Sequence, residues 1–550
     1  MSKNTARPHK TEHFARVPSI DIQRSKFDLS HGYKTTLDGG YLVPIMVQEL
    51  LPGDSWSCRA TQLCRMTTPI VPFMDNLRVS YFFFAVPKRL VWDDFEDFIT
   101  GSHKGKLGTT HTTYPTTHIY SSDWSSSGNK WSSGSIFDYM GIPPPASGKS
   151  IEVNALPLRA YNLIYNEWFR DENLCPEAYI DFGDSDGPSA LYTLRKRGKR
   201  KDYFTSALPF VQKGPDVMLP LGGTAPVVGN GMTLGLNNGT DDFGFVHTAA
   251  THPQAVKSVF GQPVGTVGNA FLAGINQSIG VTTNPEKSGL QADLSNATAA
   301  TINSLREAFA VQHLLERDAR NGTRYVESLL GHFRVQSPDF RLQRPEYIGG
   351  GRVEFAVNSV AQTGGTSSGV DTPQGNLAAF AQSVGDVGFN YSSVEHCILI
   401  GLACITCDLT YQQGLNRMWS RRQRTDEYWP EFAHLGEQPI YEQEIYATGD
   451  ESNDKAIFGY QERYAEYRYI PSYITGKLRS TDPQSLDYWH LSQEFAAPPS
   501  LSQEFIEENP PFQRVLAVQD EPQFLLDVWF RIKAIRPLPV YSVPSLLDHF

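Results

Sequence analysis

The chain has 550 residues, of which 40% are hydrophobic and 19% charged, and its formal net charge is -11. A charge balance this acidic excludes a protein coated with basic surface for duplex DNA, and the hydrophobic share is ample for a buried core. The 45 glycines and 36 prolines indicate many turns rather than long helices, so we expect one large, mainly β body with insertions.

The N-terminal segment is basic and has no apolar core of the kind a secretory signal requires. Residues 1–26 carry six basic and two acidic side chains, a net charge of +4. We predict a basic arm over residues 1–30 that becomes ordered only against a partner. The most apolar window, residues 398–405, is far shorter than the roughly 20 residues of a membrane helix, so we expect a soluble protein without membrane insertion, made in a cytosol.

The rest of the chain is organised around Leu77–Val86, LRVSYFFFAV, which lies between two prolines and contains no turn-forming residue. Its central residues are the four aromatics Tyr81, Phe82, Phe83 and Phe84. Adjacent aromatic side chains in an extended strand point to both of its faces, so both faces need cover. By composition, the best packing partners are residues 396–409 and 523–535, and we predict a β core closed by the two ends of the chain.

Two segments after this strand have helical spacing of their apolar residues, Val91–Ile99 and Leu158–Asn173. The first segment also has four carboxylates on its polar side. A pair of carboxylates can act as acid and base, but these are on the solvated face of a short helix, so we interpret them as surface charge.

The strongest basic run lies in the first part of the predicted core, residues 31–220. Its six cations are Arg195, Lys196, Arg197, Lys199, Arg200 and Lys201, and Tyr203 and Phe204 follow them. This pattern suits phosphate neutralisation with base stacking, although a solvated loop or a salt-bridge strip between subunits accounts for it equally well. Together with Lys3, Arg7 and Lys10 of the arm, these six residues are our candidate DNA contacts.

Residues 221–300 differ from the rest of the chain because they are rich in Gly, Ala, Val, Thr and Asn and poor in charge. A free linker of this composition would be poorly soluble, so we expect a projecting insertion that packs against copies of itself or a partner. Its central part is Thr224 to Asn296.

Residues 301–350 are predicted to be a helical connection. Ser304 and Glu307 fit a capping box, Asn321-Gly322 ends the first helix, and Gly331 ends a second. We interpret residues 349–388 as loop and edge strand. Residues 351–550 complete the core and end in an apolar tail, Tyr541 to Phe550, that a monomer has little reason to keep.

Tests for catalytic and metal motifs fail. Ser147-Gly-Lys-Ser150 lacks the first glycine of a phosphate loop, and the G-x-S-x-G of residues 365–369 lies in a Gly/Ser/Thr loop without a strand-to-helix turn. Cys404 and Cys407 have no second ligand pair and are interpreted as core residues. Residues 184–187 resemble half a calcium loop, which leaves only a weak surface ion site open. We therefore assign no catalytic, cofactor or metal residues and expect no enzyme.

Five long blocks of the sequence resemble the major capsid proteins of microviruses, especially the gokushoviruses. They are Arg78–Trp92 (RVSYFFFAVPKRLVW), Gly198–Pro209 (GKRKDYFTSALP), Leu305–Gly350, Gly414–Pro439 and Asp520–Phe550. These blocks extend from near the start of the chain to its last residue, which makes the resemblance far more specific than a short motif.

The resemblance implies an eight-stranded antiparallel jelly roll with long loop insertions and a few short helices. It also implies assembly of about sixty copies into a T=1 icosahedral virion shell around a circular single-stranded DNA genome, in the cytoplasm of a bacterial host. The insertion would form a three-fold protrusion that meets a host receptor, and scaffolding and DNA-pilot proteins are further expected partners.

A second class of function fits the many Trp and Tyr residues in the predicted loops. A β-sandwich carbohydrate-binding protein or glycoside hydrolase would be a monomer or small oligomer, and a hydrolase would need two carboxylates roughly 5–10 Å apart. Sequence reasoning cannot select such a pair from 59 acidic residues. Size-exclusion chromatography separates the two hypotheses, because shells elute in the void volume.

Overall fold

The computed structural model divides the chain into two compact units, Met1–Val211 with Asp318–Phe550, and Gln212–Arg317. The structure describes residues 23–103, 106–107, 113–124, 133–185, 187–217, 227–229, 235–237, 242–244, 280–281, 290–292, 302–361 and 377–541.

The first unit is built on one antiparallel sheet, in which ten strands of the described part are hydrogen-bonded. They are β1 (Ser25–Asp28), β2 (His31–Leu37), β3 (Val43–Leu50), β4 (Ser55–Met66), β5 (Leu77–Pro87), β15 (Glu346–Glu354), β16 (Ala356–Ala361), β17 (Leu377–Ser392), β18 (Cys397–Cys407) and β23 (Phe524–Arg536). Their order is β1-β23-β4-β17-β15-β5-β18-β3, with β2 beside β23 and β16 beside β17.

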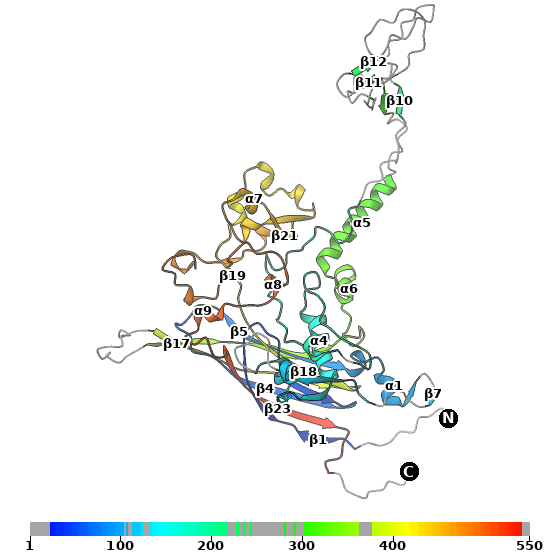
Figure 1. Ribbon diagram of the computed structural model, residues 1–550, viewed down its shortest axis with the longest axis vertical. Coiled ribbons are helices and arrows are strands. Elements are labelled where there is room, and N and C mark those ends of the chain that lie inside the picture. The colour runs from blue at the N-terminus through cyan, green and yellow to red at the C-terminus, as the bar shows by residue number, and fades with distance from the viewer. Residues whose placement is uncertain are drawn as a thin grey trace, which may run out of the picture. The chain divides into compact units, whose positions relative to one another are not determined.

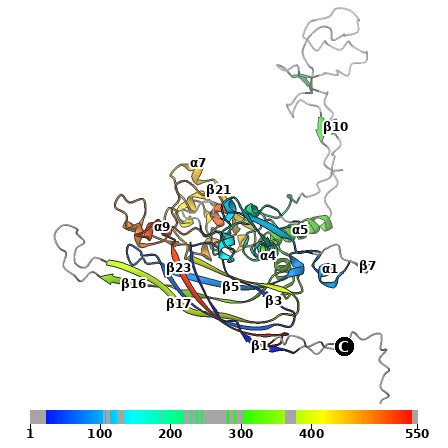
Figure 2. The ribbon, with the colours of Figure 1, turned by 60° about the horizontal axis from the view of Figure 1, so that its bottom comes forward.

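The sheet curls around its largest hydrophobic cluster (Figures 1 and 2). Side chains of β4 and β23 meet those of β5 and β18 inside this cluster, so the two parts of the sheet form two packed layers. A second cluster lies on the other face of β5 and β18, where α4 (Leu156–Ile164) covers it. The prediction of a mainly β, antiparallel core is confirmed; ten rather than eight strands hydrogen-bond in it, and the jelly-roll connectivity stays an expectation.

Strand β5 is buried on both faces, as its four aromatic residues predict. Tyr81 and Phe83 point into the first cluster, while Phe84 lies in the second and the half-buried Phe82 packs against it. Of the two predicted partners, β18 is hydrogen-bonded to β5 along its whole length, and β23 faces β5 across the first cluster. The two ends of the chain therefore meet at this core.

The prediction of loop and edge strand for residues 349–388 is wrong for β15 and β17. It is confirmed for β16, which pairs only with β17 among the described strands, and residues 362–376 lie outside the described part of the chain. β15 lies between β17 and β5, and β17 pairs with β4 over eleven positions, so both strands are in the interior of the sheet. Glycines occur there because backbones approach closely: a Cβ added at Gly350 would be 2.2 Å from Tyr81 O, and one at Gly388 would be 2.3 Å from Cys58 O.

Short elements of the first unit surround this sheet. The remaining strands are β6 (Ser102–His103), β7 (Lys106–Leu107), β8 (Thr116–Tyr120), β9 (Ser150–Asn154), β19 (Thr410–Tyr411), β20 (Glu437–Tyr441), β21 (Ile457–Glu462) and β22 (Ser472–Tyr473). The short helices are α1 (Phe95–Thr100), α2 (Ser121–Trp124), α3 (Ile136–Tyr139), α7 (Glu451–Asp454), α8 (Gln503–Ile506) and α9 (Phe512–Val515).

The predicted helices exist, with different ends. α1 begins at Phe95 rather than Val91, and the helix predicted from Leu158 continues past α4 as a π-helical turn, Tyr165–Phe169. α5 (Ile302–Asn321) ends at the predicted Asn-Gly pair. α6 (Tyr325–Phe333) passes through Gly331 and ends at Phe333, and the C-cap residue Arg334 takes the left-handed conformation in place of a glycine.

In the second unit the structure describes part of α5 and five short strands. β10 (Val227–Gly229) pairs with β14 (Leu290–Ala292), and β11 (Gly235–Asn237) lies between β12 (Asp242–Gly244) and β13 (Gly280–Val281). Most of the predicted insertion, Thr224 to Asn296, lies outside the described residues. Among the described helices, none combines the length and hydropathy needed to cross a membrane.

Candidate nucleic-acid interface

Residues 195–201 form an extended connection held between two other segments. The backbone of Lys196 forms an antiparallel β-bridge with Tyr41 on one side, and that of Gly198 forms one with Glu507 on the other. The backbone N–H of Arg197 donates to Gly40 O at 2.8 Å, and that of Lys199 donates to Ile506 O at 2.7 Å. The basic run is therefore a structural part of the first unit rather than a solvated loop.

Four of the six cations are used inside the fold. Lys199 is only 7% exposed and donates its ammonium to Phe505 O at 2.7 Å, and burial lowers its pKa. The guanidinium of Arg195 lies 5.7 Å from the ring centre of Tyr165, and that of Arg197 lies 5.2 Å from the ring centre of Phe82. Lys196 is similarly placed over Tyr41, at 5.4 Å. These contacts hold the four side chains against neighbouring groups of the first unit.

Arg200 and Lys201 are the exposed members of the run, at 57% and 58% of their side chains. Arg200 pairs with Asp408 at 3.2 Å, and Lys201 pairs with Asp171 at 2.6 Å. The two aromatics expected to stack on bases cannot do so, because Tyr203 and Phe204 are buried in a third hydrophobic cluster. A role of the run in binding DNA stays a prediction, and it depends on these two exposed cations.

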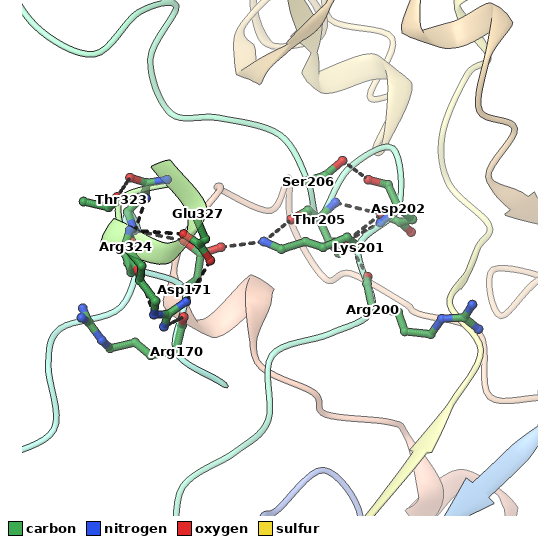
Figure 3. A network of polar contacts seen from close by, with 12 residues as sticks. Arg170, Asp171, Arg200, Lys201, Asp202, Thr205, Ser206, Thr323, Arg324 and Glu327 are labelled. Carbon is green, nitrogen blue, oxygen red and sulfur yellow. Dashed lines mark hydrogen bonds and ion pairs between the residues drawn. The ribbon is translucent and has the colours of Figure 1, made fainter. Parts of the chain in front are cut away.

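A cavity of about 650 Å³ lies beside the run, within the first unit. Its apolar wall consists of aromatic side chains, Phe82, Phe84, Trp168, Phe169 and Tyr347. Its polar wall is a network of ion pairs and hydrogen bonds that joins segments 170–173, 200–206 and 323–327 (Figure 3). The arrangement can hold an apolar or aromatic group, with hydrogen-bonding groups at its edge.

Arg324 is at the centre of this network. It pairs with Glu172 at 2.7 Å and Glu327 at 3.3 Å, and it also donates to Asn166 O and Arg170 O (Figure 3). Sequence reasoning missed this residue, because apart from Glu327 its partners lie more than 150 positions earlier in the chain.

A smaller pocket next to the run contains one buried acid among several arginines. Glu508 is 2% exposed, and its Oε1 has no hydrogen-bond partner in the described part of the chain. Arg78, Arg197, Arg200 and Arg352 line the same pocket. Burial raises the pKa of Glu508 to about 7, and the positive charges of Lys199 and Arg197 offset part of that rise.

The structure shows no catalytic or metal-binding arrangement at the described residues of the other predicted sites. Lys3, Arg7 and Lys10 lie outside the described residues. Cys404 and Cys407 are buried in different clusters on opposite faces of β18, as core residues three positions apart in a strand must be. Asp184 of the half calcium motif accepts the indole N–H of Trp92 at 2.9 Å. The described residues contain no group of three His, Cys, Asp or Glu able to hold a metal.

Comparisons with known proteins agree with the resemblance seen in the sequence. Residues 15–546 match a protein family described as "Capsid protein (F protein)". The chain is 44% identical to capsid protein VP1 of Chlamydia phage 1, with 97% of both chains covered, and 44% identical to capsid protein VP1 of Bdellovibrio phage phiMH2K, with 98% and 99% covered. It is 37% identical to capsid protein VP1 of Spiroplasma virus 4, with 99% of both covered. The chain belongs to the microvirus capsid protein family, in its gokushovirus-like branch, and is a structural protein of the virion rather than an enzyme.

Proposed function

We propose that about sixty copies of this chain assemble, in the cytoplasm of a bacterial host, into a T=1 icosahedral shell around a circular single-stranded DNA genome. The observation that carries the proposal is the match to capsid proteins over nearly the whole length of the chain. Scaffolding and DNA-pilot proteins are proposed as assembly partners.

Exposed apolar side chains in the first unit support self-association. Among the exposed apolar side chains of the first unit, eight occur in two segments, 418–435 and 467–473, and are Met418, Trp419, Tyr428, Leu435, Tyr467, Tyr469, Ile470 and Tyr473. The two segments touch, since the ring centres of Tyr428 and Tyr467 are 6.1 Å apart and Arg421 lies 4.6 Å from the ring centre of Tyr467. A joined apolar surface of this kind is typical of a protein–protein interface and would be covered by neighbouring subunits.

The proposal is tested by electron microscopy of particles purified from infected cells. We expect closed shells of one size, with about sixty copies of the chain and nuclease-protected circular single-stranded DNA inside. Purified chain that stays monomeric at high concentration, with the assembly partners supplied, would contradict shell formation.

The insertion is proposed to attach the particle to the host cell surface. Excising Thr224 to Asn296 is expected to leave particle assembly intact and to abolish attachment, because this charge-poor segment belongs to the second compact unit, apart from the sheet that forms the core. Particle yield and binding to host cells are measured side by side for the intact and the shortened chain. Normal infectivity of the shortened particle would exclude this role.

A further inference from the structure

The layer formed by β23, β4 and β17 has one open face. Along β4 and β23, buried and exposed side chains alternate, and the buried ones belong to the first hydrophobic cluster. The exposed set therefore points away from the core. Figures 1 and 2 show the helices of the first unit gathered around the other layer, with β1, β23 and β4 at the boundary of the unit.

The open face is positively charged although the chain as a whole is acidic. It carries six cations, Lys26, Lys34, Arg59, Arg65, Arg531 and Lys533, against three acids, Asp28, Asp386 and Asp527. Arg59 and Arg531 are directly opposite each other on adjacent strands. Like charges in this position destabilise a sheet, and within the chain Asp386 of β17, which pairs with Arg59 and interacts electrostatically with Arg531, is the acid that offsets part of this repulsion.

The three acids neutralise only part of this charge. Asp527 pairs with Lys34 at 3.1 Å, and Asp386 accepts from Arg59 Nε at 3.1 Å and from Thr61 Oγ1 at 2.6 Å. Asp28 accepts from the backbone N–H of Ser30 at 3.0 Å. The side chains of the other four cations, Lys26, Arg65, Arg531 and Lys533, make no hydrogen bond or ion pair within the described part of the chain, although Asp28 lies opposite Lys533 and interacts electrostatically with Lys533 and Lys26.

An exposed aromatic ring lies in the middle of this charge. Trp529 is 48% exposed, and its register partners are Thr61 on β4 and Gly32 on β2. A Cβ added at Gly32 would be 3.3 Å from the ring of Trp529, so the glycine makes room for the indole beside the neighbouring strand. Arg531 is two residues further along the same strand, so phosphate-binding and base-stacking groups are about 7 Å apart.

The basic run 195–201 is on the other layer. Its Arg197 contacts Ser80 and Phe82 of β5, on the face turned toward the second cluster rather than toward β23. A shell one subunit thick presents one of these faces to its contents, so only one of the two basic surfaces can contact the genome.

We propose that the open face of β23, β4 and β17 is the surface that contacts the encapsidated single-stranded DNA. Phosphates pair with Arg59, Arg531 and Lys533, and a base stacks on Trp529. The inference rests on the proposed function and adds the contact surface to it. An excess of cations around an exposed ring on an open sheet face suits an unpaired strand, whose bases are free to stack. A protein partner would instead require acidic groups matched to the fixed positions of these cations.

The test uses the full-length chain and oligothymidylate, with binding measured over a range of salt concentrations. Arg531→Gln with Lys533→Gln is expected to reduce the salt slope of binding by about 1.4, since each neutralised phosphate contributes about 0.7 for a single strand. Arg200→Gln with Lys201→Gln removes the same charge from the other layer and should leave the slope unchanged.

Trp529→Ala is expected to weaken binding about five-fold or more, because stacking of one base on an aromatic ring is worth at least this much. Tyr120→Ala is the matched control, since Tyr120 is 53% exposed and lies on β8, outside both the open face and the apolar surface of segments 418–435 and 467–473. Urea midpoints of all variants are measured, and ultraviolet cross-linking of intact particles is expected to join DNA to the peptide that contains Trp529.

Three results would overturn the inference. The first is a salt slope of binding that falls only for the Arg200/Lys201 control pair. The second is cross-linking of the DNA to peptides outside the open face. The third is an Arg531/Lys533 variant that keeps its DNA affinity but fails to assemble, which would make the face a subunit interface. Wild-type particles without single-stranded DNA would instead contradict the proposed function itself.

Discussion

Replacing Phe83 by alanine is expected to lower the free energy of unfolding by about 3–5 kcal/mol, as buried Phe-to-Ala changes do. Phe83 is fully buried in the first hydrophobic cluster, and its ring lies 4.9 Å from that of Phe389 on β17. Gly401 of β18 gives this ring space, because a Cβ there would be 2.9 Å from it. The large side chain thus fills the volume between the two layers, and its loss leaves a cavity that the sheet cannot close. Urea unfolding of the purified chain measures the effect.

The matched control is Val394→Ala, which removes apolar atoms from a side chain that is 85% exposed. This substitution should lower the free energy of unfolding by less than about 0.5 kcal/mol, because the same atoms contact water in the folded and the unfolded chain. Equal destabilisation by both substitutions would show that the β5 aromatics do not fill the centre of the core.

The central position of β5 could be predicted from the sequence, because the residues that require its burial are adjacent within the strand itself. Four adjacent aromatics in a segment without turn formers require cover on both faces, whatever the partners are. The covering strands β18 and β23 could be identified for a related reason, since continuous or alternating apolar residues of the right length mark them.

The interior position of β15 and β17 could not be predicted, because it depends on contacts with strands that are far away in the sequence. A run such as Gly349-Gly350-Gly351 ordinarily marks a turn. Here the glycines allow β15 to lie against Tyr81 of β5, and only the position of that partner reveals the reason. Helix ends were misplaced for a similar reason, since Arg334 takes the left-handed conformation usually given to glycine.

Local clustering of charge in the sequence does not show which cations are exposed. Six cations close together in the sequence suggested a phosphate-binding run, yet four of them pack against aromatic rings or backbone carbonyls in the structure. The open face is marked more weakly in the sequence, because its cations come from several strands that are far apart along the chain. The alternation of Asp527, Trp529, Arg531 and Lys533 with apolar residues was the one indication available in the sequence.

Replacing Glu508 by glutamine is expected to remove a pH dependence of stability. Burial raises the pKa of Glu508 from its ordinary 4.5 to about 7. The stability that the protonated acid provides is therefore complete below pH 4.5 and is lost as the pH rises through about 7. The change corresponds to about 3 kcal/mol at 1.36 kcal/mol per pKa unit. The two proteins should be about equally stable at low pH, and the glutamine variant should be the more stable above pH 7.

Other buried acids with raised pKa, such as Glu444 and Asp75, change the stability of both proteins alike. The difference between the two urea-unfolding curves, measured against pH, therefore isolates Glu508. Glu504→Gln, at an exposed position four residues earlier, should follow the parent protein at every pH. Parallel curves for the parent and the Glu508 variant would mean that this carboxyl has the same pKa in the folded and the unfolded chain. Lys199, Arg197 and Arg78 would then offset the cost of burial, and at neutral pH the pocket would be a neutralised ion-pair cluster rather than one with unbalanced positive charge.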